Sequence, residues 1–296
     1  MGFVLSARQE GAAGGSGLLL RQSPLPSTST HSDEIPGELN MAFDGKVALI
    51  SGGTRGIGLN VAKSLVDAGA FCYVTGRNED DGRRAQELLG ENARYVAVDV
   101  TEENAVISLF DLIESRHGRL DLAVNNAGVT TKRAAVRELD LKEWKRVLDI
   151  NLVGPLLLMS HEIRLMARHE RAAIVNVSSC GGVLGQPRQS AYSSSKAALN
   201  MLTQVAAIES ANPPEGQNVV RMNAVCPGPT LGGMNTEERL RANPESTQEK
   251  IQSTAMKRFA KPEEITAAIL WLLSEQASYV TGTLLSVDGG FVAGKF

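Results

Sequence analysis

Several features are scarce in this sequence of 296 residues, and each scarcity excludes a class of protein. There are only three cysteines (Cys72, Cys180 and Cys226), and none stands at the spacing of a metal ligand, so neither a disulfide framework nor a metal site is expected. A reduced, cytoplasmic setting is favoured. The net charge of −3 gives no reason to expect nucleic acid or an anionic membrane as a partner. No apolar run approaches the roughly eighteen residues that a membrane-spanning helix needs.

What the sequence does contain is a regular alternation of short apolar runs with helical patterns. Strands are expected at residues 47–50, 71–74, 95–98, 120–124, 174–177, 219–225 and 284–287. Helices are expected at residues 59–68, 84–89, 106–115, 192–209 and 262–273, and a long helical stretch before residue 174 is expected to break near Gly154 and Pro155. This alternation predicts an α/β fold with a doubly wound, mostly parallel sheet of the Rossmann type. Because no change of composition follows residue 41, residues 41–296 are predicted to form a single domain.

Residues 1–40 differ in composition from the rest of the chain. They contain a Gly- and Ala-rich run at 11–17 and a run rich in Ser, Thr and Pro at 23–30, and neither shows a sustained period. Segments of this kind bury too little apolar surface to fold. We predict a disordered N-terminal extension; the alternatives are a remnant of cloning and an over-called start upstream of Met41.

A glycine-rich turn, Ser51-Gly52-Gly53-Thr54-Arg55-Gly56-Ile57-Gly58, joins the first expected strand to the first expected helix. Glycines at this place permit a tight turn and let backbone amides approach a pyrophosphate at the helix N-terminus. The spacing G-x-x-x-G-x-G differs from the G-x-G-x-x-G pattern of many dinucleotide sites. The turn is interpreted as a dinucleotide site, and the alternative is an ordinary strand-to-helix connection.

The end of the second expected strand bears on the choice between NAD and NADP. A carboxylate there would bind the ribose 2′-hydroxyl, whereas arginine would suit a 2′-phosphate. The strand runs into Thr75-Gly76-Arg77 with no carboxylate at its tip, and Arg55 supplies a second guanidinium. Acidic residues 79–81 are interpreted as the first turn of a helix capped by Asn78, although one of them could instead reach the ribose. NADP(H) is therefore the preferred cofactor, with NAD(H) as the alternative.

Residues that can carry chemistry follow further expected strands. Asn125-Asn126-Ala127-Gly128 ends the fourth strand, and Ser178-Ser179 ends the fifth. Tyr192 and Lys196 stand four residues apart, which places phenol and ammonium on one helix face. A nearby positive charge lowers the pKa of a tyrosine, and a hydroxyl at a strand end can hold a substrate oxygen. Each of these patterns alone also suits a structural loop or a surface helix.

Together these residues closely resemble the classical short-chain dehydrogenase/reductase family, over about residues 44–291. The glycine turn, the Asn125 segment, Asn151, Ser179, Tyr192 and Lys196 occur in the order of the family. Tyr192 stands thirteen positions after Ser179, as in typical members, which selects Ser179 over Ser178. Residues 221–228 resemble the segment of the family at the nicotinamide, and residues 261–265 and 279–290 resemble its C-terminal helix and strand.

The resemblance implies a role for each matched residue. Tyr192 would be the general acid/base, Lys196 would lower its pKa and bind the nicotinamide ribose, and Ser179 would bind the reacting oxygen. Asn151 would hold a water that links Lys196 to solvent, or else mark a helix kink, and Asp99 would face the adenine, cap the next helix, or both. The implied cofactor contacts are Gly52, Thr54, Arg55, Gly56, Ile57, Gly58, Arg77, Asp99, Val100, Asn125, Ala127, Gly128, Tyr192, Lys196, Pro227, Gly228 and Thr230.

One position departs from the pattern of the family. Members often carry threonine five positions after the proline of the Pro227-Gly228 segment, where this chain has Gly232. Thr230 is taken as the substitute. Residues 234–257 lie where the family has a mobile lid over the substrate.

The function expected from the resemblance is NADP-dependent interconversion of a carbonyl, of ketone or 3-oxoacyl type, and a secondary alcohol. An NAD-linked alcohol or polyol dehydrogenase is the alternative. A non-catalytic dinucleotide sensor is a remote one, because all four catalytic positions are filled. The family also implies a small-molecule substrate and a homo-oligomer, either a tetramer or a dimer.

Overall fold

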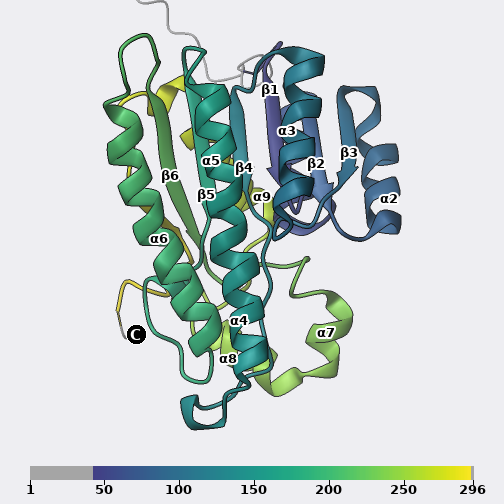
Figure 1. The fold of residues 1–296 in the computed structure, drawn as a ribbon. Helices are drawn as coiled ribbons and strands as arrows, with labels where there is room; N and C mark the ends of the chain where they lie inside the picture. Colours follow the sequence, from purple (N-terminus) through teal and green to yellow (C-terminus); the bar gives the residue numbers. More distant parts are fainter. Residues whose placement is uncertain (1–42, 295–296) are drawn as a thin grey trace, which may run out of the picture. The chain divides into compact units, whose positions relative to one another are not determined.

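The central element of the fold is one sheet in which every neighbouring pair of strands is parallel. The structure is a computed structural model that describes residues 43–294, so the interpretation of residues 1–40 falls outside the described part of the chain. The strands, in the order β3-β2-β1-β4-β5-β6-β7, are Ala93–Ala97, Phe71–Gly76, Val47–Ser51, Leu122–Asn125, Ala172–Val177, Val220–Pro227 and Leu284–Val287 (Figure 1). All described residues belong to one compact unit, which confirms the single α/β domain.

Helices cover both faces of the sheet (Figure 1). α3 (Glu103–His117), α5 (Gly154–Met166) and α6 (Ser190–Ala211) pack on one face, and α1 (Gly56–Asp67), α2 (Glu79–Leu89) and α9 (Pro262–Leu273) pack on the other. Leu49 of β1 belongs to the first apolar layer and Ile50 to the second. A strand that is buried on both faces reads as a continuous apolar run, which explains why the strands could be located from sequence.

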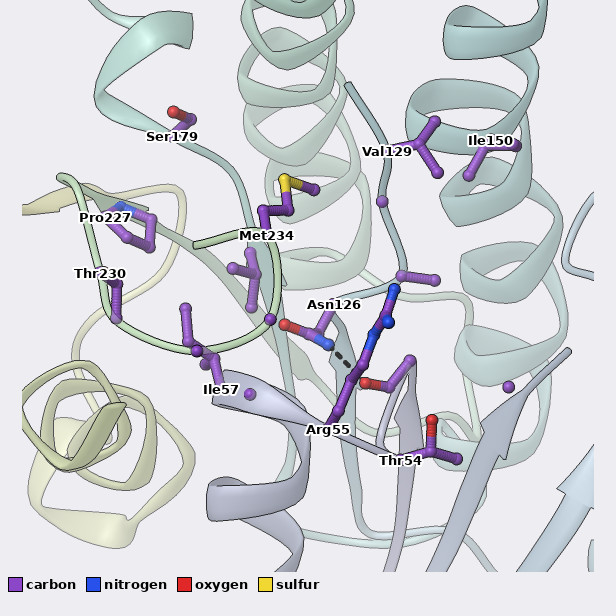
Figure 2. Close-up of a pocket in the computed structure, with 18 of the residues that line it drawn as sticks. Thr54, Arg55, Ile57, Asn126, Val129, Ile150, Ser179, Pro227, Thr230 and Met234 are labelled. Atoms are coloured by element: carbon purple, nitrogen blue, oxygen red, sulfur yellow. Dashed lines mark hydrogen bonds between the residues drawn. The ribbon is translucent and has the colours of Figure 1, made fainter. Parts of the chain in front are cut away.

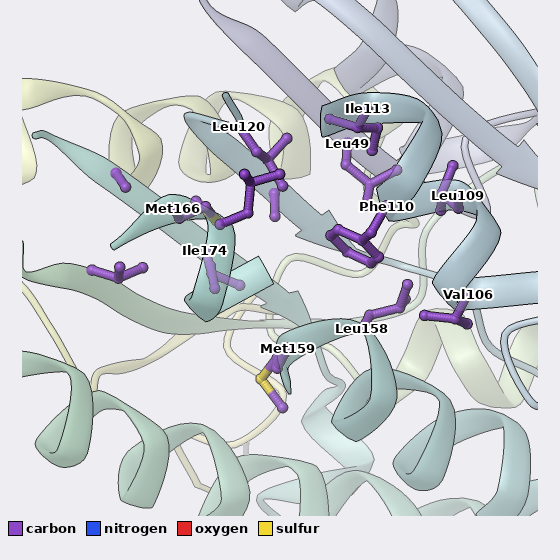
Figure 3. Close-up of a cluster of buried hydrophobic side chains, with 14 of the residues drawn as sticks. Leu49, Val106, Leu109, Phe110, Ile113, Leu120, Leu158, Met159, Met166 and Ile174 are labelled. Carbon is purple, nitrogen blue, oxygen red and sulfur yellow. The ribbon is translucent and has the colours of Figure 1, made fainter. Parts of the chain in front are cut away.

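A layer of buried apolar side chains lies between the sheet and helices α3 and α5. Figure 3 shows Leu49, Phe110, Leu158 and Ile174 among side chains that meet between these helices and the sheet. Burying a side chain of this size contributes about 1.5–3 kcal/mol. The sheet edge that carries the functional residues is therefore fixed by packing on both sides.

The order of the strands reverses beside β1. The chain winds from β1 through β2 to β3 in one direction and from β4 to β7 in the other. In open α/β sheets, ligands bind at the carboxyl ends of the strands at such a reversal. The glycine turn after β1 and the Asn125 segment at the end of β4 both lie there.

The long helix before β5 differs from the expectation. The sequence predicts a break near Gly154 and Pro155, but α4 (Leu141–Leu148) passes into α5 through a π-helical segment, Asp149–Val153. A proline inside a regular helix removes one N–H donor and clashes with the carbonyl one turn back, and the wider π turn gives the proline ring room beside that carbonyl. The regular α-helix is therefore interrupted next to Gly154, as predicted, but by a π-helical segment and not by an end of the helix.

Other boundaries shift by a few residues. β3 begins at Ala93, earlier than expected, whereas α2 begins at Glu79, directly after its predicted cap Asn78. The segment at residues 234–257 contains two short helices, α7 (Glu237–Ala242) and α8 (Pro244–Gln252). Within residues 43–294, no helix combines the length and the apolar character needed to cross a membrane.

Candidate active site

The carboxyl ends of the central strands open into a cavity of about 420 Å³. Its lining comes from the glycine turn before α1, the end of β2, the loops after β3, β4 and β6, the end of β5 and the head of α6 (Figure 2). The predicted residues that line it are Gly52, Thr54, Arg55, Gly56, Ile57, Arg77, Asp99, Val100, Ala127, Gly128, Ser179, Tyr192, Lys196, Pro227, Gly228 and Thr230. Gly58, Asn125 and Asn151 do not line it.

The glycine turn needs its glycines for two physical reasons. Gly52 and Gly56 have backbone φ values of 62° and 57°, which residues other than glycine rarely adopt. A Cβ on Gly52 would also lie 2.9 Å from Cα of Ala127. Gly58 has a different task, because a Cβ there would lie 2.4 Å from the carbonyl oxygen of Gly52. Gly58 therefore lets α1 pack against the turn.

The first turn of α1 presents backbone amides to the cavity. Arg55 is the N-cap residue in an extended conformation, and no side chain caps the helix there. Gly56 and Ile57, the first two helical residues, line the cavity. Uncapped amides at a helix N-terminus bind phosphate groups, so this turn fits the pyrophosphate of a dinucleotide.

Two arginines and two aspartates meet at the outer end of the cavity. Nη1 of Arg77 lies 3.3 Å from Oδ2 of Asp99, and Nη1 of Arg55 lies 4.0 Å from Oδ2 of Asp81. All four residues line the cavity. The side chain of Asn78 accepts a hydrogen bond from the backbone N–H of Asp81, which confirms the predicted cap of α2. Figure 2 shows Arg55 extending along the cavity.

Asp99 is held as a carboxylate by its neighbours. Burial acts to raise its pKa, but hydrogen bonds from the backbone and hydroxyl of Thr101 and the guanidinium of Arg77 outweigh burial, so the pKa lies below its usual value. The expected capping role is not observed, because Glu102 is the N-cap residue of α3 and Asp99 bonds to Thr101 ahead of it.

The inner end of the cavity brings Ser179, Tyr192 and Lys196 together. The ammonium of Lys196 donates a hydrogen bond to the carbonyl oxygen of Val177, at 2.8 Å. A short 3₁₀ turn, Cys180–Gly182, packs on α6 so closely that a Cβ on Gly182 would lie 2.7 Å from the carbonyl carbon of Lys196. This contact fixes the end of β5 against the helix that carries Tyr192.

The two serines after β5 have different partners. Oγ of Ser178 donates to the backbone carbonyl of Lys196 at 3.2 Å, so its proton is used inside the protein. Oγ of Ser179 accepts a hydrogen bond from the backbone N–H of Gly181 at 3.0 Å, which leaves its own proton for another acceptor. This difference supports the choice of Ser179.

Burial shifts the pKa of both groups on α6. It raises the pKa of Tyr192 above 10.0, and the hydroxyl of Ser179 acts in the opposite direction. It lowers the pKa of Lys196 to about 8. The sequence predicts that Lys196 lowers the pKa of Tyr192, whereas the pKa is raised here because burial dominates.

Asn151 lies in the π-helical segment and is fully buried. Its amide nitrogen donates to the carbonyl of Val129 and to Oγ of Ser195, and its amide oxygen accepts from the N–H of Val129. Oγ of Ser195 in turn donates to the carbonyl of Tyr192. Asn151 therefore ties the loop after β4 to the helix of Tyr192 and Lys196.

Sequence reasoning missed the part that Asn126 plays. Its amide nitrogen donates to the carbonyl of Gly52 at 2.9 Å, and the residue lines the cavity (Figure 2). Asn125, its neighbour, points instead toward α5 on one face of the sheet, where its amide nitrogen donates to Glu162 and Asn176. Alternation along a strand places consecutive side chains on opposite faces, and that signal could have separated the two.

The loop after β6 was also only partly anticipated. Residues 231–235 line the cavity, and a Cβ on Gly56 would lie 3.0 Å from Cα of Gly233. Gly232 has φ of 75°, a conformation that threonine would adopt only under strain. The departure from the family pattern at this position thus has a backbone cause, and Thr230 lines the cavity nearby.

Comparison with known proteins gives a consistent result. Residues 52–292 match the family model described as Enoyl-(Acyl carrier protein) reductase. A cis-4-hydroxycyclohexanecarboxylate dehydrogenase of Sinomonas cyclohexanicum is 38% identical over 258 residues, which is 85% of this chain and 98% of the relative. A cyclopentanol dehydrogenase of Comamonas testosteroni is 36% identical over 251 residues, or 84% and 97% of the two chains.

The crystal structure of gox2181 aligns with a TM-score of 0.76 and 28% identity, covering 85% of this chain and 97% of that one. Sequence match, fold and cavity therefore agree. The chain belongs to the classical short-chain dehydrogenase/reductase family, whose members use a nicotinamide dinucleotide to oxidise alcohols or reduce carbonyl groups.

Proposed function

We propose that this protein is an NADP-dependent oxidoreductase that interconverts a ketone, including the 3-oxoacyl type, and a secondary alcohol. The observation that carries the proposal is the pair of guanidinium groups, Arg55 and Arg77, at the outer end of the cavity that holds Tyr192 at its inner end. Guanidinium groups bind phosphate oxygens through two parallel N–H donors, so a 2′-phosphate suits this end.

The residues of the cavity divide among the parts of the cofactor. The amides at the start of α1 would hold the pyrophosphate, Asp99 and Val100 would lie at the adenine, and Lys196 would bind the nicotinamide ribose. Pro227, Gly228 and Thr230 would lie at the carboxamide. Gly58 and Asn125 would support the site from outside the cavity. The bound dinucleotide would supply or accept the hydride.

Tyr192 is the proposed general acid/base. Because its pKa is raised, the phenol holds its proton at neutral pH and is ready to protonate a carbonyl oxygen. In reduction, Oη of Tyr192 gives its proton to that oxygen, and the Lys196 ammonium would stabilise the phenolate left behind. The free proton of the Ser179 hydroxyl would donate a hydrogen bond to the same oxygen as charge develops on it.

A water beside Gly128 is the proposed link between Lys196 and Asn151. A Cβ built on Gly128 would lie 3.3 Å from Oδ1 of Asn151 and 3.5 Å from Nζ of Lys196, so both polar atoms face the space next to this glycine. A water there would accept from the ammonium and donate to the amide oxygen. It would return a proton to Lys196 and Tyr192 after each turnover.

An NAD-linked dehydrogenase of secondary alcohols is the second candidate. It is favoured by the carboxylates of Asp81 and Asp99, which line the outer end of the cavity and could bind a ribose 2′-hydroxyl. The ring alcohols named for the two relatives also agree with oxidation of a secondary alcohol.

Assembly and location are part of the proposal. A homo-oligomer, either a tetramer or a dimer, is supported by the family and by the exposed apolar side chains Met201 and Ile208 on α6. A cytoplasmic location is supported by Cys72, Cys180 and Cys226, which are all free and buried.

Titration of the apo protein with each dinucleotide tests the choice of cofactor. NADPH should bind at least about tenfold more tightly than NADH, a difference of roughly 1.4 kcal/mol. With the preferred cofactor, absorbance assays on ring ketones, a 3-oxoacyl thioester and the matching alcohols should then identify the substrate class. Equal or reversed affinities would reject the role given to Arg55 and Arg77 and favour the NAD-linked candidate.

A further inference from the structure

A carboxylic acid lies in the core directly behind the cofactor cavity. Glu162 of α5 is fully buried between that helix and the sheet. Its Oε2 accepts a hydrogen bond of 2.9 Å from the amide nitrogen of Asn125, the last residue of β4. None of the roles proposed for the cavity involves Glu162.

Asn125 belongs to a chain of buried polar groups. Its amide nitrogen also donates to Oδ1 of Asn176 at 3.0 Å, so both N–H bonds of Asn125 are used. The amide nitrogen of Asn176 donates to the hydroxyl of Thr203, which donates to the carbonyl of Leu199. The chain thus connects β4, β5 and α6 behind the site.

Two oxygen atoms of this chain lack a partner within the described residues: Oε1 of Glu162 and Oδ1 of Asn125. They belong to the two groups that already share a hydrogen bond at Oε2. A proton on Oε1 would donate to Oδ1, giving the cyclic pair that a carboxylic acid forms with a primary amide. One proton therefore satisfies both atoms, whereas a carboxylate would leave two acceptors buried without a donor.

Among residues 43–294, no cation stands near enough to keep Glu162 ionised. β4 and β5 carry no charged side chain within their bounds, and the charged residues of α3 are exposed. The charged residues of α6 are Lys196, whose ammonium donates to the carbonyl of Val177, and Glu209, which is exposed. On α5 itself, Arg164 is exposed and the ring of His161 stacks on Phe110. Burial, opposed only by the bond from Asn125, raises the pKa of Glu162 to about 8.

We propose that Glu162 is a positioning residue: it stays protonated at neutral pH, pairs with the amide of Asn125, and so fixes the turn against which the dinucleotide binds. The link to the cavity is short, because Asn126, Ala127 and Gly128 follow Asn125 and all line it. The amide of Asn126 holds the carbonyl of Gly52, and the N–H of Ala127 donates to Oγ of Ser51. This effect on the cofactor rests on the proposed function.

The sign of the pH dependence follows from the direction of the shift. The pKa of Glu162 is about 8 in the folded protein and 4.5 without its surroundings. Between these values the folded state holds a proton that the unfolded state has lost, so stability decreases as pH rises through this window. Above pH 8 the carboxylate forms in both states and this contribution becomes constant.

Three variants distinguish the effect of the hydrogen-bonded pair of Glu162 and Asn125 from the effect of core packing in general. Glu162→Gln keeps the pair, because the amide oxygen of the glutamine can accept from the amide nitrogen of Asn125 and its amide nitrogen can donate to Oδ1 of Asn125. Glu162→Leu removes both hydrogen bonds at similar volume. Leu165→Ala, about one turn further along the same helix, is the control for stability loss without loss of polar partners. Melting temperature and the dissociation constants of NADPH and NADH would be measured from pH 6 to pH 9, with the infrared band of a protonated carboxyl followed by difference spectra.

The wild type minus Glu162→Gln spectrum should show the carboxylic acid band at pH 6 and lose it toward pH 9. Glu162→Gln should retain dinucleotide affinity and show a flatter decline of melting temperature above pH 6. Glu162→Leu should weaken binding on the order of tenfold, and Leu165→Ala should lower the melting temperature while leaving affinity unchanged. An ionised carboxyl at pH 6, or a Glu162→Gln variant that binds as weakly as Glu162→Leu, would overturn the proposal. If no variant and not even the wild type binds either dinucleotide, the proposed function fails, and the infrared result still decides the state of Glu162.

Discussion

The two ends of the cavity are built from opposite kinds of side chain. At the inner end, Ser179 and Lys196 are 7% and 3% exposed, and burial sets the pKa of the lysine. At the outer end, the side chains of Arg55 and Arg77 are 67% and 56% exposed and form ion pairs with Asp81 and Asp99. Exposed ion pairs of this kind contribute about 0–1 kcal/mol and are screened by salt.

Because the two ends differ in this way, we expect the inner end to govern the reaction and the outer end to govern the choice of cofactor. The inner end is held by the backbone contacts of Lys196, Ser178 and Gly182, so a substitution there acts on buried, closely packed groups. The outer end consists of long, exposed side chains that pair with carboxylates. We therefore expect large effects on turnover with unchanged binding at the inner end, and modest effects on binding with unchanged turnover at the outer end.

Tyr192→Phe should give the largest effect. Removing the hydroxyl takes away the proton donor, so turnover should fall by about 10²–10⁴-fold, the usual contribution of a positioned acid or base. The dissociation constant of NADPH should remain within about twofold, since the ring still fills its place beside Ser179. Stopped-flow absorbance and a binding titration on the same preparation measure the two quantities. Retained turnover would remove Tyr192 from the mechanism.

The adjacent serines sharpen the comparison within the inner end. Ser179→Ala should lower turnover by about 10²–10³-fold, because it removes a donor aimed at the developing charge. Ser178→Ala loses the hydrogen bond to the Lys196 carbonyl and the contact with Cys226, and it should cost about fivefold or less. Steady-state rates of both variants at saturating cofactor give the ratio. The reverse ranking would show that the spacing to Tyr192 selected the wrong serine.

Much of the fold followed from the sequence because buried parallel strands are continuous apolar runs. The runs at residues 47–50 and 174–177 lie within β1 and β5. The helix at Gly154 and Pro155 could not be predicted, since a π turn is chosen by tertiary packing: a Cβ on Gly154 would lie 2.6 Å from a methyl group of Val100. Local sequence propensity depends on the proline but contains no information about Val100, which is distant in the chain.

At the site, motifs located most of the residues that line the cavity, because glycines and serines at strand ends are visible in the sequence. The partners of these residues were not visible. Nothing in the sequence shows that Asn125 faces Glu162, which lies 37 positions away, or that Arg77 pairs with Asp99. The direction of the Tyr192 pKa shift was missed for the same reason, since burial depends on residues distant in the chain.

Arg77→Gln tests the outer end and should give a smaller effect than Tyr192→Phe or Ser179→Ala. The guanidinium follows Gly76, the last residue of β2, and loss of its donors should weaken NADPH binding by about tenfold, or roughly 1.4 kcal/mol. Asp99 would lose its cationic partner and repel a 2′-phosphate, while NADH, which lacks that phosphate, should bind as before. Arg83→Gln is the matched control: it removes the same charge from α2, at a residue that does not line the cavity. Titrations at low and high salt compare the affinities for NADPH and NADH. In the wild type, the difference between these affinities should shrink as ionic strength rises. In Arg77→Gln, it should be small at every salt concentration. If Arg77→Gln and Arg83→Gln weaken NADPH equally, the effect is one of net charge, and the outer end does not select the cofactor through Arg77.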